Sequence, residues 1–386
     1  MPLYIIKYCV PIIILTLSQA PAFAADPHPL PENYWQKPLA LQGEAPEHSL
    51  APEACGECHA GQYEEWRSSL HAKAFSPGLV GQLMASFAGG LSDCMQCHAP
   101  LAEQEQAFRD ALKAGRGHIP AAQGLAAAGN SCSGCHLRGR KHYGPPKAVT
   151  GETGQSDSAD SHGGVFRSAG FEDSSFCASC HQFPPSWGAV NGKPLENTHN
   201  EWKDSPQGKK GVTCQSCHMP GRRHLWLGIH DPEMTASGLT PAFSAKSDKA
   251  SFALTNTGVG HAFPTYVTPK AVMRAVRLDD GGEPIRESEV FRVIRRSVSF
   301  ADGVWVEAFD TRLPPGRSES LDITWGAARR VRMWLEIYPD DFYDHQVYDG
   351  LKSSLKGEAA KLIAKADDDA GKSRYRLFET DLDRPR

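Results

Sequence analysis

The spacing of apolar and polar residues divides the chain into two unlike parts. Through residues 25–245 no long periodic run occurs, and Gly/Pro-rich loops such as 144–154 and 184–194 alternate with short stretches of helical composition at 62–74 and 100–114. We therefore expect short helices joined by irregular segments. A regular apolar face that could form a core is missing from this pattern.

Beyond residue 250 the pattern becomes that of short β-strands. Alternating apolar residues from Val331 to Ile337 give the last strand one face directed toward a core. Turn-forming sequences separate the strands at 279–282, 302–303 and 314–316. The predicted strands are 252–255, 271–278, 290–299, 304–309, 321–325 and 331–338.

These strands predict an all-β sandwich of immunoglobulin-like kind at 246–345. Residues 346–386 are expected to form a C-terminal helix, at 356–366, and an extended tail that includes 375–378. The expected organisation is thus a helical and irregular domain at 25–245, followed by the sandwich and the tail.

Residues 1–24 have the features of a secretory signal peptide. Lys7 supplies the positive start, an apolar run extends from Val10 to Leu17, and Ala24 ends a small-residue cleavage site. We expect a mature periplasmic protein that begins near Ala25. An uncleaved N-terminal anchor is the alternative. No later stretch approaches the ~18 apolar residues that span a bilayer, so no transmembrane segment is predicted in the mature chain.

Charge narrows the range of partners. The 386 residues carry 41 Lys and Arg against 45 Asp and Glu, a formal net charge of −4. This balance argues against a nucleic-acid partner, which requires a basic face.

The candidate chemistry is concentrated in five copies of the motif Cys-x-x-Cys-His. Two thiols at this spacing add to the two vinyl groups of one porphyrin, while the histidine that follows binds the iron. Ten of the 11 cysteines belong to the motifs, and the other, Cys9, lies in the predicted signal peptide. The motifs are Cys55/Cys58/His59, Cys94/Cys97/His98, Cys132/Cys135/His136, Cys177/Cys180/His181 and Cys214/Cys217/His218.

We therefore predict five haem c groups per chain. Their porphyrins would supply the buried apolar surface that the side chains of the first domain do not. A zinc ribbon and a disulfide framework are the alternatives, but neither requires a histidine directly after every second cysteine.

Each iron has one further axial position, and nine histidines outside the motifs and the N-terminal tail could fill it. His71 is the foremost candidate, because it follows a motif on a predicted helix. The candidate distal ligands are His71, His142, His199, His224, His230 and His261. Of His224 and His230, six residues apart, only one is expected to bind. A hydrogen-bonded or exposed imidazole is favoured for His118, His162 and His345. Met219 and Met234 are minor alternatives.

One short sequence occurs twice. Residues 65–69 read Glu-Trp-Arg-Ser-Ser and residues 201–205 read Glu-Trp-Lys-Asp-Ser. A histidine follows the first tryptophan by five residues, whereas Gln207 occupies that place in the second copy. We expect Trp66 and Trp202 to act through packing, between porphyrin planes.

Two stretches resemble a known family. Cys55-x-x-Cys58-His59 with the run from Gln62 to Ala72 is similar to the opening of multihaem cytochromes of the cytochrome c-554 type. The motifs at 177–181 and 214–218, with their flanking residues, resemble pentahaem and larger relatives. The resemblance covers about residues 50–235 and implies electron transfer with most haems held by two histidines. The fifth motif and the appended β-domain depart from the tetrahaem pattern, which leaves the redox partner undetermined.

The expected function is that of a periplasmic electron carrier rather than an enzyme. Its expected partners are a membrane quinol dehydrogenase, other cytochromes or a periplasmic reductase. An oxidoreductase in which one haem keeps an open position, and acts on a small nitrogen or sulfur compound, is the alternative. A structural conductor that docks through the β-domain is a third possibility.

Overall fold

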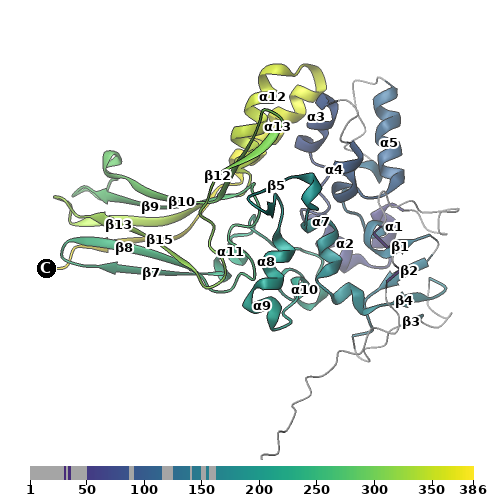
Figure 1. Ribbon diagram of the computed structural model, residues 1–386, viewed down its shortest axis with the longest axis horizontal. Helices are drawn as coiled ribbons and strands as arrows, with labels where there is room; N and C mark the ends of the chain where they lie inside the picture. Colours follow the sequence, from purple (N-terminus) through teal and green to yellow (C-terminus); the bar gives the residue numbers. More distant parts are fainter. Residues whose placement is uncertain are drawn as a thin grey trace, which may run out of the picture.

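Figure 1 shows a part built of short helices, from which a part built of antiparallel strands extends; the C-terminus lies at the far end of the strands. The computed structural model describes residues 30–31, 34–35, 50–86, 91–114, 125–139, 141–148, 154–155 and 162–386, with the backbone alone at 86, 126, 154, 155 and 345. The predicted signal peptide and His118 lie outside the described residues.

The described helices before residue 240 are short, as the irregular apolar pattern predicts. They are α1 Pro52–Gly56, α2 Ala60–Ser68, α3 Pro77–Ser86, α4 Leu91–His98, α5 Ala102–Lys113, α6 Cys132–His136, α7 Ser175–His181, α8 Thr198–Asp204, α9 Pro206–Lys209, α10 Cys214–His218 and α11 Pro232–Ser237. Short strands accompany them: β1 Leu137–Arg138, β2 Lys141–Gly144, β3 Gly154–Gln155, β4 Val165–Arg167, β5 Ala189–Val190 and β6 Lys193–Pro194.

Helix α2 ends earlier than the predicted 62–74. Ser69 adopts an extended conformation, and its hydroxyl donates a 2.6 Å hydrogen bond to the Trp66 carbonyl. This bond satisfies a carbonyl that helix termination leaves without an intrahelical partner. His71 therefore lies in the turn after α2 rather than on the helix.

The β-sandwich is confirmed. Its strands are β7 Leu239–Ala245, β8 Lys249–Asn256, β9 Lys270–Leu278, β10 Val290–Ile294, β11 Arg296–Ala301, β12 Val304–Asp310, β13 Ser318–Thr324, β14 Arg330–Tyr338 and β15 Tyr375–Asp383. One sheet has the order β13-β8-β7 and the other β10-β9-β14-β15, while β11 and β12 form a separate hairpin. This division and order correspond to the two sheets of an immunoglobulin-like sandwich.

Alternating residues of the two sheets meet in one apolar core. Phe252 and Leu254 from β8 face Met273 of β9 and Leu335 of β14, and all four are fully buried. The period of two along each strand places these residues inward together.

Two strands fall outside the predicted bounds of the sandwich. β7 pairs with β8 although it contains Pro241, which lacks a backbone donor and is tolerated because β7 is the last strand of its sheet. β15 pairs with β14, so the predicted extended tail is a strand of the sandwich. The predicted strand 290–299 is divided at Arg295 into β10 and β11.

The chain returns to the helical part between β14 and β15. The π-helix η7 Tyr343–Tyr348, α12 Asp349–Ser354 and α13 Gly357–Lys372 form this return, and α13 lies beside α3 (Figure 1). A Cβ atom on Gly81 of α3 would lie 2.8 Å from Ile363 of α13, so the glycine permits this close approach. In the part of the chain that is described, no helix is long and apolar enough to cross a membrane.

Candidate haem-binding sites

Each Cys-x-x-Cys-His motif lies on or directly after a short helix. Helices α4, α6, α7 and α10 contain the second to fifth motifs, and the first motif runs from the end of α1 to the residue before α2. A separation of three residues places both thiols of a motif on one helix face.

The ten motif cysteines are all described, and they form no disulfide bonds. The second cysteines of the motifs differ in exposure: Cys58 and Cys217 are exposed, whereas Cys97, Cys135 and Cys180 are half-buried. The cysteines of the motifs are therefore not arranged as a disulfide framework. That all ten cysteines, Cys97 and Cys217 among them, attach porphyrins through thioether bonds stays a prediction from the motif.

Hydrogen bonds fix the rings of four motif histidines. Nδ1 lies 2.9 Å from the Ala74 carbonyl in His98, 2.8 Å from the Tyr143 carbonyl in His136 and 2.6 Å from the Leu227 carbonyl in His218. In His181 it lies 3.1 Å from a carboxylate oxygen of Glu196. A ring that donates through Nδ1 leaves Nε2 as the nitrogen that can bind a metal.

Four motif histidines have a second histidine ring opposite them. Two imidazoles that bind one metal from opposite sides, each at roughly 2.0 Å from metal to nitrogen, have ring centroids about 6 Å apart. The observed centroid distances are 6.0 Å for His59 and His162, 6.2 Å for His136 and His224, 6.2 Å for His181 and His71, and 6.4 Å for His218 and His261. This spacing fits an iron held between each pair.

Three of the predicted distal candidates therefore face a motif histidine: His71, His224 and His261. They come from the turn after α2, from the segment after α10 and from the loop between β8 and β9. The sequence favoured a non-ligating role for His162, whereas the structure places its ring opposite His59. His162 lies just before β4, and the parallel pairing of β4 with β2, for which the local sequence carries no signal, brings this segment beside His142.

The other predicted candidates have different surroundings. The His142 ring stacks on His162 at 4.1 Å. His199 lies beside Trp202 at 5.3 Å, and His230 Nε2 lies 3.0 Å from a carboxylate oxygen of Asp340. Of the pair His224 and His230, the structure thus brings only His224 to a motif.

The buried rings favour the neutral imidazole that metals bind. Burial, and then the neighbouring His181, lowers the pKa of His71 to about 3. Burial likewise lowers the pKa of both His136 and His261 to about 4. His181 differs: burial lowers its pKa, but the hydrogen bond and charge of Glu196 outweigh this, so that the pKa is raised to about 9.

The motifs adjoin one another in a defined order. The thiols of Cys55 and Cys132 are hydrogen-bonded, which joins the first motif to the third, and those of Cys177 and Cys214 join the fourth to the fifth. Cys135 interacts electrostatically with Cys180, so the third motif adjoins the fourth. Helix α4, with the second motif, contacts α7, with the fourth. The fourth motif therefore lies at the centre.

The second motif, Cys94/Cys97/His98, differs from the others. Among the described side chains, no histidine ring faces His98. Tyr343 is half-buried near Cys94, and desolvation of its hydroxyl raises the pKa to about 12, which keeps it protonated at neutral pH.

Taken together, helix-borne Cys-x-x-Cys-His motifs and opposed histidine rings define the class of multihaem c-type cytochromes, and haem c is the cofactor that this class binds. Residues 54–136 match the family model described as cytochrome c554 and c-prime. The expected resemblance to multihaem c-type cytochromes and the expected cofactor type, haem c, are thus confirmed.

A solved structure supports the fold. The chain is similar to the crystal structure of a penta-heme cytochrome c552 from Thermochromatium tepidum, with a TM-score of 0.61 and 17% sequence identity, over 88% of this chain and 100% of that chain. At this identity the likeness concerns the fold. No curated protein sequence matches the chain.

Proposed function

We propose that this protein is a periplasmic electron-transfer protein with five covalently bound c-type haems, of which four have two histidine ligands. The four opposed ring pairs, with centroids 6.0 to 6.4 Å apart, are the observation that supports this most directly. Haem iron held by two histidines exchanges single electrons without a change of ligands.

The chain's own residues would perform three tasks. The motif cysteines attach the cofactor through thioether bonds, and the motif histidines bind iron through Nε2. His162, His224, His71 and His261 close the first, third, fourth and fifth sites. Each pair shields its metal from other ligands, which suits a carrier rather than a catalyst.

The order of the motifs suggests the order of the sites. The first, third, fourth and fifth adjoin in sequence, and the second branches from the fourth. The fourth site would then exchange electrons with three neighbours. A membrane quinol dehydrogenase, other cytochromes or a periplasmic reductase are the proposed partners.

The second motif supports an alternative function. Because no described histidine side chain faces His98, this site is the one at which an open axial position would occur. A protein with an open haem there would act as an oxidoreductase on a small nitrogen or sulfur compound. The protonated hydroxyl of Tyr343, near Cys94, would be a hydrogen-bond donor in that region.

Low-temperature electron paramagnetic resonance of the air-oxidised protein, with haem content fixed by pyridine haemochrome assay, tests both proposals. We expect five haems per chain and at least four low-spin ferric irons. A fifth low-spin iron would support the carrier alone. A high-spin signal near one iron per chain, whose g values change in His98→Ala, would support the oxidoreductase. Fewer than four low-spin irons would contradict the assigned ligand pairs.

A further inference from the structure

The repeated Glu-Trp sequence makes the same contact in both copies. The Trp66 indole Nε1–H donates a 2.7 Å hydrogen bond to the carbonyl of Asn130, two residues before Cys132. The Trp202 indole donates a 2.8 Å bond to the carbonyl of Val212, two residues before Cys214. Each tryptophan therefore anchors the segment that leads into a haem-binding motif.

Glu65, the residue before the first tryptophan, binds the segment that contains Arg223 and His224. A carboxylate oxygen of Glu65 accepts a 2.8 Å hydrogen bond from Nε of Arg223, and the other accepts a 2.8 Å bond from the backbone N–H of His224. The ring of His224 faces His136, the histidine of the motif that Trp66 anchors.

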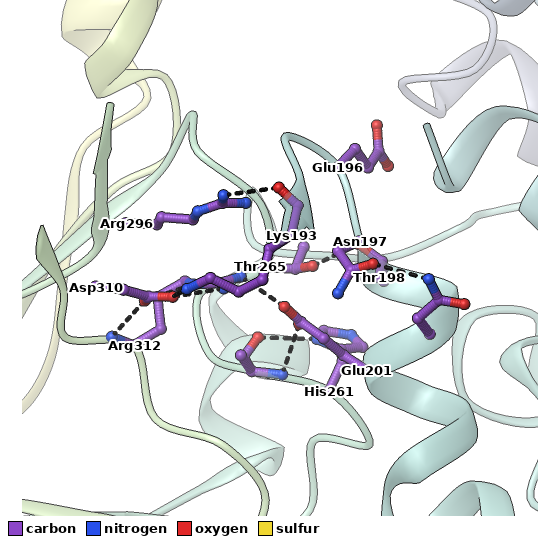
Figure 2. Close-up of polar contacts among 12 residues, drawn as sticks. Lys193, Glu196, Asn197, Thr198, Glu201, His261, Thr265, Arg296, Asp310 and Arg312 are labelled. Atoms are coloured by element: carbon purple, nitrogen blue, oxygen red, sulfur yellow. Dashed lines mark hydrogen bonds and ion pairs between the residues drawn. The ribbon is translucent and has the colours of Figure 1, made fainter. Parts of the chain in front are cut away.

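The glutamate of the second copy repeats this arrangement with the β-sandwich. Glu201 accepts a 3.2 Å bond from the backbone N–H of Ala262, next to His261, and lies 3.0 Å from Nη1 of Arg312 (Figure 2). The ring of His261 faces His218, the histidine of the motif that Trp202 anchors.

The sandwich holds its arginine rigidly. Arg312 is buried and donates two hydrogen bonds of 2.9 Å to Asp310, which in turn accepts a 2.6 Å bond from Lys193 of β6 (Figure 2). The loop also fits closely, because a Cβ atom on Gly260 would lie 3.3 Å from Gln207 and 3.4 Å from Trp202. Gln207 stands where the first copy has His71.

From this correspondence we infer that Glu65 and Glu201 are positioning residues. Each holds the loop that carries a distal histidine against the helix whose tryptophan anchors the motif of the same haem site. The tryptophan next to each glutamate fixes the motif, and the glutamate fixes the loop with the distal histidine. In the second copy that loop belongs to the sandwich, so the β-domain serves as a ligand-supplying module for the fifth haem. The inference rests on the proposed histidine ligation.

The test uses the full-length holoprotein, with Glu201→Ala, Arg312→Gln and His261→Gly as the variants at the fifth site. We expect His261→Gly to convert one low-spin ferric iron to high-spin, and saturating imidazole to reverse the change. Glu201→Ala and Arg312→Gln should convert a fraction of the same iron, also reversibly with imidazole. Glu65→Ala should do the same at the third site. Asp204→Ala, an exposed carboxylate of the same helix α8, is the matched control.

Two outcomes separate this inference from the proposed ligation. If His261→Gly produces the high-spin iron but Glu201→Ala and Arg312→Gln leave the spin count unchanged, even with a lower melting temperature, the positioning role is wrong. If His261→Gly itself changes nothing, the assignment of His261 as a ligand fails. If Glu201→Ala does not fold, Glu201→Gln takes its place in the test. The glutamine retains an oxygen that can accept from the Ala262 N–H, but it cannot form the ion pair with Arg312.

Discussion

His181 donates to a carboxylate, whereas His98, His136 and His218 donate to backbone carbonyls. A carboxylate withdraws the proton on Nδ1 more strongly, which makes the ligand nitrogen more basic and stabilises ferric over ferrous iron. Among these four sites, the fourth is therefore expected to be the hardest to reduce.

Glu196→Gln should raise the midpoint potential of one haem. The amide still accepts the hydrogen bond but lacks the charge, and we expect a shift on the order of a tenfold change in the ferric/ferrous ratio, about 59 mV for one electron. Spectroelectrochemical titration of the variant beside Glu64→Gln, which removes an exposed carboxylate, would measure it. Unchanged potentials in both variants would contradict the role of Glu196.

Gly129 lies against the backbone of His71, the proposed distal ligand of the fourth site. Its φ is +56°, and a Cβ atom would lie 2.4 Å from the His71 carbonyl oxygen. Gly129→Ala should lower the free energy of unfolding by roughly 2 kcal/mol, through crowding and backbone strain, and weaken the low-spin signal of the fourth site. Gly139→Ala is the matched control, because it has φ +57° and open space; equal effects of the two would exclude crowding.

At this scale the sequence identified the motif residues, but it did not indicate that the ring of His162 lies opposite a motif histidine. The motif is local, since two thiols and a histidine on one turn suffice for attachment. The ring that lies opposite His59 is that of His162, more than a hundred residues away, and no local pattern distinguishes it from the neighbouring His142. The pairing of β2 with β4, which the local sequence does not indicate, brings the two segments together.

The hairpin β11–β12 fastens the sandwich to the helical part through charged groups. Arg296 of β11 is fully buried, donates to carbonyls of residues 190–195 and pairs with Glu307 at 2.6 Å. Asp310 of β12 joins Lys193 and Arg312 in the same region (Figure 2). Removing one member of such a network leaves a buried charge without its partner.

Asp310→Asn should therefore destabilise the protein at pH 7, by about 3 kcal/mol. Burial opposes ionisation of Asp310, but hydrogen bonds from Arg312 and Lys193 outweigh it and lower the pKa of the carboxyl. A lowered folded-state pKa contributes stability above the unfolded value of about 3.9, and this contribution is lost as the pH falls further.

Urea unfolding followed by circular dichroism checks this prediction at several pH values. The difference between wild type and Asp310→Asn should be largest near neutral pH and shrink below about pH 4. Asp322→Asn, which removes an exposed pair with Lys249, is the control. A difference that does not depend on pH would show that the Asp310 charge is not responsible.

The elements of the sandwich were predicted better than those of the helical part. Strand alternation and turn residues are local signals, and β8, β9, β12, β13 and β14 all appear where expected. β7 was missed because Pro241 interrupts its pattern. The end of α2 was placed too late because the sequence does not show that both the backbone N–H and the hydroxyl of Ser69 donate to the Trp66 carbonyl.

The two parts of the molecule have unequal apolar cores. The sandwich contains the largest described cluster of buried residues, with Trp325 and Phe252 among them, whereas the clusters of the helical part are small and separate. The helical part therefore depends on porphyrin surface for its stability, and the sandwich does not.

A chain without haem should accordingly fold only in part. With all ten motif cysteines changed to alanine, limited proteolysis should leave a resistant fragment that begins near β7 and extends to β15, while the helical part is degraded. Mass spectrometry of the fragments, with the intact holoprotein as reference, would identify it. Equal resistance of the whole chain would contradict the idea that haem forms the first core.

The position of His71 has a consequence for biosynthesis. It precedes the motif whose histidine it faces, whereas His162, His224 and His261 all follow theirs. A chain exported from its N-terminus would present both proposed ligands of the fourth site as soon as its own motif emerges. The first site would be complete slightly earlier, once His162 has emerged, and the third would wait for His224. The fifth site would be the last of the four, because its pair is complete only when the loop after β8 has emerged.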